Sequence, residues 1–140
     1  MRACLLLRQY CVFFCPSLLL VYNCFGDNVK RRIIEKPWGF EQIWAQTDDY
    51  VAKMLHIEPK QRLSLQYHEK KEETVYVLEG TLLNWTDEES PPQRYITGQV
   101  LHIKPNQTHR FGADKEMVRL MEVSTPHLDD VVRLADDYDR

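Results

Sequence analysis

Four side chains in the middle of the chain could together bind a divalent metal ion. They are Gln66, His68, Glu73 and His109. An amide oxygen, a carboxylate oxygen and two imidazole nitrogens form a mixed oxygen and nitrogen ligand set, which suits divalent transition metals. The sequence therefore predicts one divalent metal ion as cofactor. Zn²⁺ is expected first, with Co²⁺, Mn²⁺ and Fe²⁺ as alternatives.

The spacing of these residues agrees with short strands. Side chains alternate between the two faces of a strand, so Gln66 and His68 point the same way if residues 62–68 are extended. The β-branched and apolar run 74–78 follows a charged turn, residues 69–72, and predicts a returning strand that lets Glu73 face His68. His109 follows a third predicted strand and a loop that contains Pro105.

Length and composition indicate one soluble globular domain. The chain has 140 residues, of which 44% are hydrophobic and 28% are charged, and its net charge is −3. This charge gives no reason to expect nucleic acid as a partner. All four cysteines lie in the first 24 residues, so any later metal site must use nitrogen and oxygen ligands.

Residues 1–28 form a hydrophobic leader. It contains Arg2 and Arg8 and two apolar stretches, which is typical of a secretory signal or anchor, of an organelle-targeting leader, or of a start codon placed too far upstream. A membrane association is expected only if the leader is a retained anchor. The glycosylation pattern at Asn106 lies three residues before His109, where a glycan would crowd the metal loop. We therefore expect a cytoplasmic protein, with a secretory or organellar location as the alternative.

The rest of the chain, residues 29–140, reads as an all-β domain. Short strands separated by turn residues predict a small barrel or jelly roll. A short C-terminal helix is possible over 128–137, where Leu128, Val131, Val132 and Ala135 share one helical face. The expected strands are 41–47, 50–58, 62–68, 74–79, 81–86, 94–96, 99–103, 109–112 and 117–124.

The same residues resemble the two motifs of cupins, which are double-stranded β-helix barrels that bind a metal. Four residues separate His68 from Glu73, six separate Glu73 from Gly80, and Gly98 begins the second motif, in which His109 has the ligand position. Gln66 stands where the first histidine is usual. The resemblance is stronger to the C-terminal cupin domain of type II mannose-6-phosphate isomerases, often fused to a mannose-1-phosphate guanylyltransferase. It covers roughly residues 33–140 and is carried by residues 36–39, 62–68, 104–110 and 128–138.

This resemblance implies a metal-dependent isomerase that interconverts mannose 6-phosphate and fructose 6-phosphate through an enediolate. The metal would bind the sugar's C1 and C2 oxygens, a base would move a proton between the two carbons, and basic side chains would hold the phosphate. The chain departs from the family at Tyr67, over 69–71 and over 106–108, and it carries no nucleotide-binding loop of the guanylyltransferase.

Strand alternation suggests catalytic and substrate-binding candidates. Arg62 shares the predicted face of Gln66 and His68, so it should point into the same cavity, as a catalytic and substrate-binding residue. Lys53 shares a face with apolar neighbours and is a candidate for both roles, although a lysine at a strand edge could simply extend to solvent. Glu122 is a possible base or a solvated residue.

Two further arginines are candidates for binding the phosphate. Arg110 is expected on the face opposite His109, and Arg133 could also be an ordinary surface charge. The remaining histidines, His56, His102 and His127, are expected to be structural.

Two other functions remain open at this stage. A non-catalytic cupin that binds a sugar or sugar nucleotide would agree with the altered motif loop and the missing partner domain. An Fe(II) oxygenase would agree with a mixed ligand set, although basic cavity residues favour an anionic substrate. Exposed sheet faces also predict a homodimer.

Overall fold

The computed structural model describes residues 11–12, 21–22 and 32–140. The predicted leader, residues 1–28, therefore lies outside the described residues except for β1 (Cys11–Val12) and β2 (Val21–Tyr22), which pair antiparallel. Within the part of the chain that the structure describes, no helix is long and apolar enough to cross a membrane.

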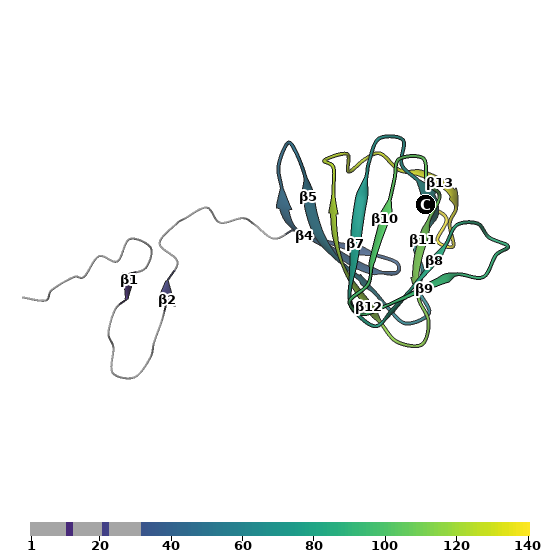
Figure 1. The fold of residues 1–140 in the computed structure, drawn as a ribbon, viewed down its shortest axis with the longest axis horizontal. Helices are drawn as coiled ribbons and strands as arrows, with labels where there is room; N and C mark the ends of the chain where they lie inside the picture. Colours follow the sequence, from purple (N-terminus) through teal and green to yellow (C-terminus); the bar gives the residue numbers. More distant parts are fainter. Residues whose placement is uncertain (1–10, 13–20, 23–31) are drawn as a thin grey trace, which may run out of the picture.

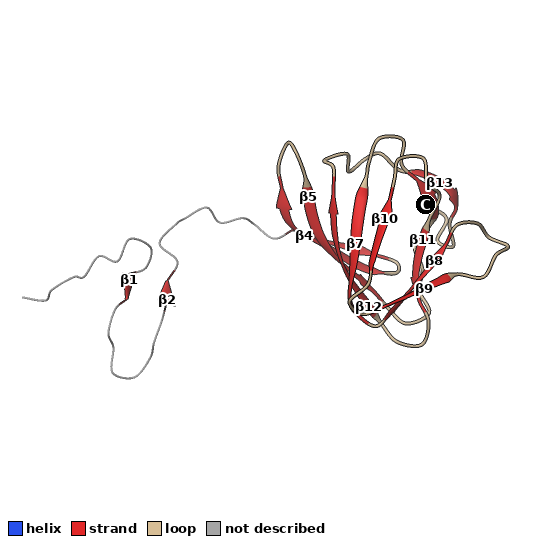
Figure 2. Cartoon of the chain, in the orientation of Figure 1, coloured by secondary structure: helices blue, strands red, loops and turns tan. Residues whose placement is uncertain are grey.

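Residues 32–140 form a barrel of antiparallel strands, and Figures 1 and 2 show its two sides. One side is a six-stranded sheet. In spatial order it contains β10 (Val100–Ile103), β7 (Glu73–Glu79), β12 (Val118–Ser124), β5 (Val51–Ile57), β4 (Gly39–Gln46) and β3 (Arg32–Lys36).

The other side of the barrel consists of two smaller sheets joined by isolated bridges. One contains β11 (Arg110–Ala113), β8 (Thr81–Trp85) and β9 (Gln93–Ile96), and the other pairs β13 (Val132–Ala135) with β6 (Leu65–Tyr67). Bridges from Arg62 to Gly112 and from Gln66 to His109 place the β6 segment beside β11. The predicted all-β fold is confirmed.

Side chains alternate between the inside and the outside of the barrel along each strand. In β7, for example, Glu73, Val75 and Val77 are buried, whereas Thr74 and Tyr76 are exposed. The inward apolar side chains of both sides make one core, since burial of apolar area stabilises the folded state. Its members are Trp38, Leu55, Ile57, Val75, Val77, Leu82, Leu101, Ile103, Phe111, Ala113, Val118 and Leu120.

The turn from β3 to β4 places Trp38 in this core. Gly39 ends the turn with a φ of 139°, and a Cβ atom at this position would lie 2.0 Å from the carbonyl oxygen of His56. Only glycine therefore permits β4 to approach β5 this closely. The Trp38 side chain is 2% exposed.

The possible C-terminal helix over 128–137 is wrong, because this segment contains β13. β13 pairs antiparallel with β6, and the Arg110 guanidinium donates a hydrogen bond to the carbonyl oxygen of Ala135 at 3.0 Å. The β6 edge offers backbone partners that an isolated amphipathic pattern does not reveal, so tertiary pairing overrides the weak helical periodicity.

Candidate metal centre

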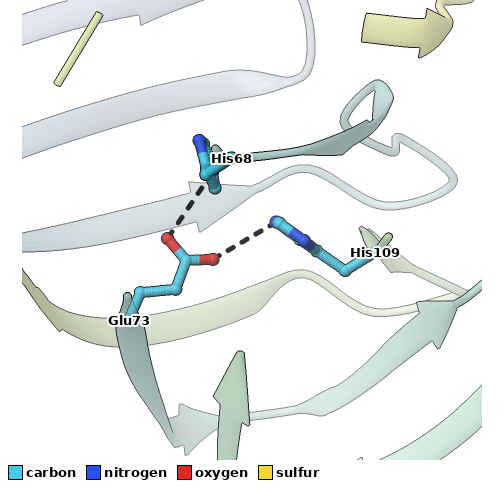
Figure 3. Close-up of side chains that lie close together, drawn as sticks. All are labelled: His68, Glu73 and His109. Carbon is cyan, nitrogen blue, oxygen red and sulfur yellow. Dashed lines mark ion pairs between the residues drawn. The ribbon is translucent and has the colours of Figure 1, made fainter. Parts of the chain in front are cut away.

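Three of the four predicted metal ligands meet inside the barrel. His68, Glu73 and His109 each offer a ligand atom, and these atoms lie within 4.8 Å of one another. Figure 3 shows the Glu73 carboxylate between the two rings, with Oε1 3.2 Å from Nε2 of His109 and Oε2 3.9 Å from Nε2 of His68. The three residues are only 1–3% exposed.

The strand ends bring these residues together. Glu73 is the first residue of β7, His68 directly follows β6, and His109 directly precedes β11. Gln66 and His109 exchange two backbone hydrogen bonds, of 3.0 and 2.9 Å, and this pairing fixes the separation of the two histidine segments. Gln66 and His68 are predicted to point the same way, and both line the same cavity.

Both imidazole rings are oriented by backbone carbonyl groups. Nδ1 of His68 contacts the carbonyl oxygen of Asp130, and Nδ1 of His109 lies 3.1 Å from that of Gln107. A carbonyl can only accept, so each Nδ1 carries a proton, and in the neutral ring the lone pair is then on Nε2. Metal-binding histidines are commonly oriented in this way.

The two Nε2 atoms provide a test of whether a metal fits. Both are buried, and neither has a hydrogen-bond partner among the described residues. Unpartnered buried polar atoms are destabilising unless another group satisfies them. Two imidazole lone pairs that converge on a carboxylate are the donors that a divalent cation requires, so the residues present fit such an ion.

The protonation states also suit metal binding. Burial lowers the pKa of His68, which favours the neutral imidazole that a metal needs. Burial by itself raises the pKa of Glu73, but the adjacent His109 and the charge of Lys71 outweigh it and hold that pKa well below its usual range. Glu73 is therefore a carboxylate.

Gln66, the fourth predicted ligand, lines the cavity near the three buried residues. Its side-chain oxygen, Oε1, accepts a hydrogen bond of 2.7 Å from the hydroxyl of Ser64. An amide oxygen has two lone pairs, so this bond leaves one of them for another partner. The role of Gln66 as a ligand remains a prediction.

Sequence reasoning missed Lys71, which it placed in a charged turn. Its side chain is buried, and its ammonium group contacts Oε2 of Glu73 and lies 2.8 Å from Oε1 of Glu122. Burial lowers the pKa of Lys71, but the two carboxylates outweigh this effect and raise it, so the lysine is charged. Extending the β7 alternation back by two residues would have indicated this inward direction.

The turn that carries Lys71 is held by Asp130. The Asp130 carboxylate accepts backbone hydrogen bonds of 3.2, 2.7 and 2.8 Å from Glu69, Lys70 and Lys71. These three bonds outweigh the effect of partial burial and lower the pKa of Asp130. Through its carboxylate and its carbonyl, Asp130 therefore positions both the Lys71 turn and the His68 ring.

An alternating row of charges continues from Lys71 toward the edge of the sheet. Oε2 of Glu122 lies 3.3 Å from Nζ of Lys53, and Lys53 lies 3.5 Å from Glu41. Glu41 in turn lies 3.6 Å from Lys36. Lys53 and Glu122 thus face the cavity as buried residues, and their catalytic roles remain predictions.

The candidate ligands line a cavity of about 370 Å³. Its lining contains six lysine and arginine residues but only four aspartate and glutamate residues, although the whole chain carries a net charge of −3. Arg133, a predicted phosphate ligand, is among them, and sequence reasoning missed Arg32, Lys36 and Arg140. This excess of positive charge favours an anionic ligand.

The predicted direction of Arg62 is wrong. Arg62 donates hydrogen bonds of 2.6 and 3.1 Å to the Asp137 carboxylate and lies over the Trp85 ring, away from the cavity lining. The predicted strand 62–68 shortens to Leu65–Tyr67, and the neighbours Leu63 and Ser64 both line the cavity. Alternation therefore breaks between Arg62 and Gln66.

Arg110 lies on the face opposite His109, as predicted. Its guanidinium is buried near Glu88 and Asp137, at 3.7 and 3.8 Å, and it does not line the cavity. The structure therefore does not bring Arg110 together with the other substrate-binding candidates.

The three remaining histidines also lie away from the cavity lining. His56 stacks on Phe40, and His102 lies 2.9 Å from the hydroxyl of Thr74.

Several solved structures share this fold. The chain aligns with KdgF from Halomonas sp. at a TM-score of 0.62 and 20% identity, over 76% of this chain and 97% of that one. It aligns with the polyketide cyclase RemF from Streptomyces resistomycificus at a TM-score of 0.67 and 19% identity, over 80% and 84%. An oxalate decarboxylase from Lactobacillus farciminis aligns at 0.61 and 20%, over 74% of this chain and 33% of that one.

These identities are low, so the similarities establish the fold and leave the activity open. A comparison with curated proteins gave no significant match. The model of the cupin domain family matches residues 53–124, which is more than half of the chain and includes all four predicted metal ligands. The protein therefore belongs to the cupin family and has the predicted small cupin barrel.

Proposed function

We propose that this cupin is a metal-dependent isomerase that interconverts an aldose phosphate and a ketose phosphate, with mannose 6-phosphate and fructose 6-phosphate as the substrate pair. The observation that carries the proposal is the buried group of His68, Glu73 and His109 inside a cavity whose lining has excess positive charge. The resemblance to type II mannose-6-phosphate isomerases supplies the substrate.

The proposed metal ligands are His68, Glu73 and His109, with Gln66 as the fourth. A divalent metal ion bound there would supply the Lewis acidity that polarises the sugar carbonyl. Zn²⁺ is the first choice, because two imidazoles and a carboxylate are common zinc ligands.

Glu122 is the proposed base in this reaction. Its carboxylate would accept the proton from the carbon next to the carbonyl and return it to the neighbouring carbon. It lies in the same cavity as the candidate ligands, between the ammonium groups of Lys71 and Lys53 at 2.8 and 3.3 Å. Those two cations fix the direction of both carboxylate oxygens and would be close to negative charge that develops on the sugar.

The proposed phosphate ligands are Arg32 and Arg133, two of the three arginines that line the cavity. Arg32 and Arg133 both line it, and Arg133 is the cross-strand neighbour of Gln66. Arginine suits a phosphate because its planar group can donate two parallel hydrogen bonds. Arg62 and Arg110 have no place in this proposal, since neither lines the cavity.

The test is a coupled assay of fructose 6-phosphate formation from mannose 6-phosphate. The full chain is stripped of metal and reconstituted separately with Zn²⁺, Co²⁺, Mn²⁺ and Fe²⁺. We expect turnover that depends on the metal, that is lost in His109→Ala and that persists in His102→Ala, a matched histidine outside the cavity. Turnover that survives both metal removal and His109→Ala would contradict the proposal.

One observation favours a second candidate, a sugar-phosphate-binding protein without catalysis. Both oxygens of Glu122 are already engaged by lysines, and Lys71 also contacts Glu73, so the proposed base is held in an ion-pair network. This candidate predicts tight binding of metal and of mannose 6-phosphate, measured by calorimetry, with no turnover under any metal.

A further inference from the structure

We propose that Lys71 limits the metal centre to one carboxylate ligand by holding Glu122 away from the ion. The inference rests on the metal centre of the proposed function, but it concerns a residue that neither the cupin motifs nor the isomerase resemblance assigns. In this view Lys71 is a positioning residue, which acts on the metal through Glu73 and Glu122.

The first argument is the position of the ammonium group. It lies between two carboxylates, in contact with Oε2 of Glu73 and 2.8 Å from Oε1 of Glu122. The side chains of all three residues are 2–5% exposed, so water does little to separate or screen these charges. Lys71 is therefore the cation that allows two buried carboxylates to lie near each other.

The second argument is the strand register. Ser124 of β12 is paired with Glu73 of β7, and Glu122 is paired with Val75. Glu122 and Glu73 thus lie on the same face of adjacent strands, as diagonal neighbours that long side chains can bridge. The register therefore places Glu122 beside Glu73 on the neighbouring strand.

The third argument is charge balance. Two buried carboxylates close together repel each other unless a cation lies between them. If the ammonium is removed, a divalent ion that already binds Glu73 becomes the available cation for Glu122. Addition of a second carboxylate strengthens the binding of a divalent ion, because it adds an anionic oxygen ligand and neutralises more of the charge.

The experiment measures Co²⁺ binding to the metal-free full chain, by calorimetry and by the visible absorption of the bound ion, without any assay of turnover. Lys71→Met should bind Co²⁺ at least about tenfold more tightly than the wild type, with a changed absorption spectrum. Lys71→Gln should show the same direction and keeps a polar group if the methionine variant folds poorly. Lys70→Met, at the exposed neighbouring lysine, is the matched control and should bind like the wild type.

A second pair of variants separates recruitment of Glu122 from simple loss of repulsion. We compare Glu122→Gln with the double variant Lys71→Met/Glu122→Gln. If Glu122 joins the ligand set, the gain caused by Lys71→Met shrinks to less than about threefold in this background. A gain of equal size in both backgrounds would overturn the inference, because repulsion alone would then account for it.

The remaining outcomes distinguish this inference from the proposed function. Equal Co²⁺ affinity in the wild type and Lys71→Met overturns the inference and leaves the metal centre intact. Binding by Lys71→Met but not by the wild type supports the inference and overturns the proposed metal-dependent activity of the native chain. Absence of Co²⁺ binding in both overturns both.

Discussion

The two ends of the barrel interior are built from the same strands but have different side chains, apolar at one end and charged at the other. On β5, β7 and β12, inward positions at one end are apolar and belong to the core, whereas each strand has one charged inward residue toward the other end, which lines the cavity. The apolar set is Leu55, Ile57, Val75, Val77, Val118 and Leu120, and the charged set is Lys53, Glu73 and Glu122. Both sets are at most 8% exposed, so burial alone does not distinguish them.

The two ends of the barrel interior depend on different forces. Apolar burial at the core end is strongly stabilising, whereas desolvation offsets most of the attraction in a buried ion pair. The charged side chains therefore contribute little to the net free energy of unfolding. Their charges are tolerated because each has an opposite neighbour, and we infer that they serve binding and chemistry.

The protein should lose most stability when the row of alternating charges that runs from Lys71 through Glu122, Lys53 and Glu41 to Lys36, here called the charged row, is broken at one point. Among the described residues, Glu122→Met leaves Lys53 with the more distant Glu41 as its acidic partner, and it removes one partner of Lys71. Removal of one member of a buried pair typically destabilises a protein by about 3–5 kcal/mol. We expect a loss of this size in the free energy of unfolding, measured by urea denaturation of the metal-free protein.

The double variant Lys53→Met/Glu122→Met sharpens this prediction. The row alternates in sign, so removal of two adjacent members leaves Glu73 paired with Lys71 and Glu41 paired with Lys36. We expect the double variant to unfold within about 1 kcal/mol of the wild type. A double variant that is less stable than Glu122→Met would show that the charged row itself stabilises the fold.

The matching change at the core end is Leu120→Ala, two residues away on the same strand. Leu120 is fully buried in the core, and truncation should leave a cavity that destabilises the protein by about 3 kcal/mol. Co²⁺ affinity, measured on the folded protein, should stay within about twofold of the wild type. A metal-binding defect as large as that of His109→Ala would mean that the two ends are not separable.

A smaller effect, on metal affinity, is expected at Asp130, which positions the site residues but does not line the cavity. Asp130→Ala removes the acceptor for the amides of Glu69, Lys70 and Lys71 but keeps the carbonyl that contacts His68. Substitution of a residue that orients ligands commonly weakens metal binding, here by about tenfold. Asp130→Asn, which retains one oxygen acceptor, should lose less. If both variants bind Co²⁺ like the wild type, the turn is held by other contacts.

Sequence reasoning predicts most of this fold because the strands alternate cleanly. Nine expected strands lie within a few residues of the observed ones, and the shared directions of Gln66 and His68 follow from regular spacing. The family motifs then bring His109 to the same place. These predictions use local pattern, which is strong wherever one face of a strand is buried.

The failures occur where tertiary contacts replace local pattern. β13 forms because the edge of β6 is free to pair, and Lys71 turns inward because Asp130, about 60 residues away, binds its turn. Arg62 lies where the chain leaves regular strand geometry, so alternation cannot be continued through it. Contacts of this range have no signature in the nearby sequence, although the β7 alternation, extended back by two residues, indicates the inward direction of Lys71 itself.

The smallest effect is expected at Arg62, whose pair with Asp137 is half-exposed. Arg62→Ala should change the free energy of unfolding by about 0.2–1 kcal/mol, as is typical of exposed ion pairs. The C-terminal segment keeps two other attachments, from Tyr138 to Gln61 at 2.7 Å and from Arg110 to Ala135 at 3.0 Å. The cavity wall should therefore stay in place, and the affinity for mannose 6-phosphate, measured by calorimetry, should change by less than about twofold.

Arg133→Ala, in the cavity lining, should weaken that affinity by about tenfold, because it removes a cation that would face the phosphate. Equal losses in the two variants would mean that Arg62 reaches the bound sugar phosphate after all, and the distinction between cavity and outer surface would then fail at this residue.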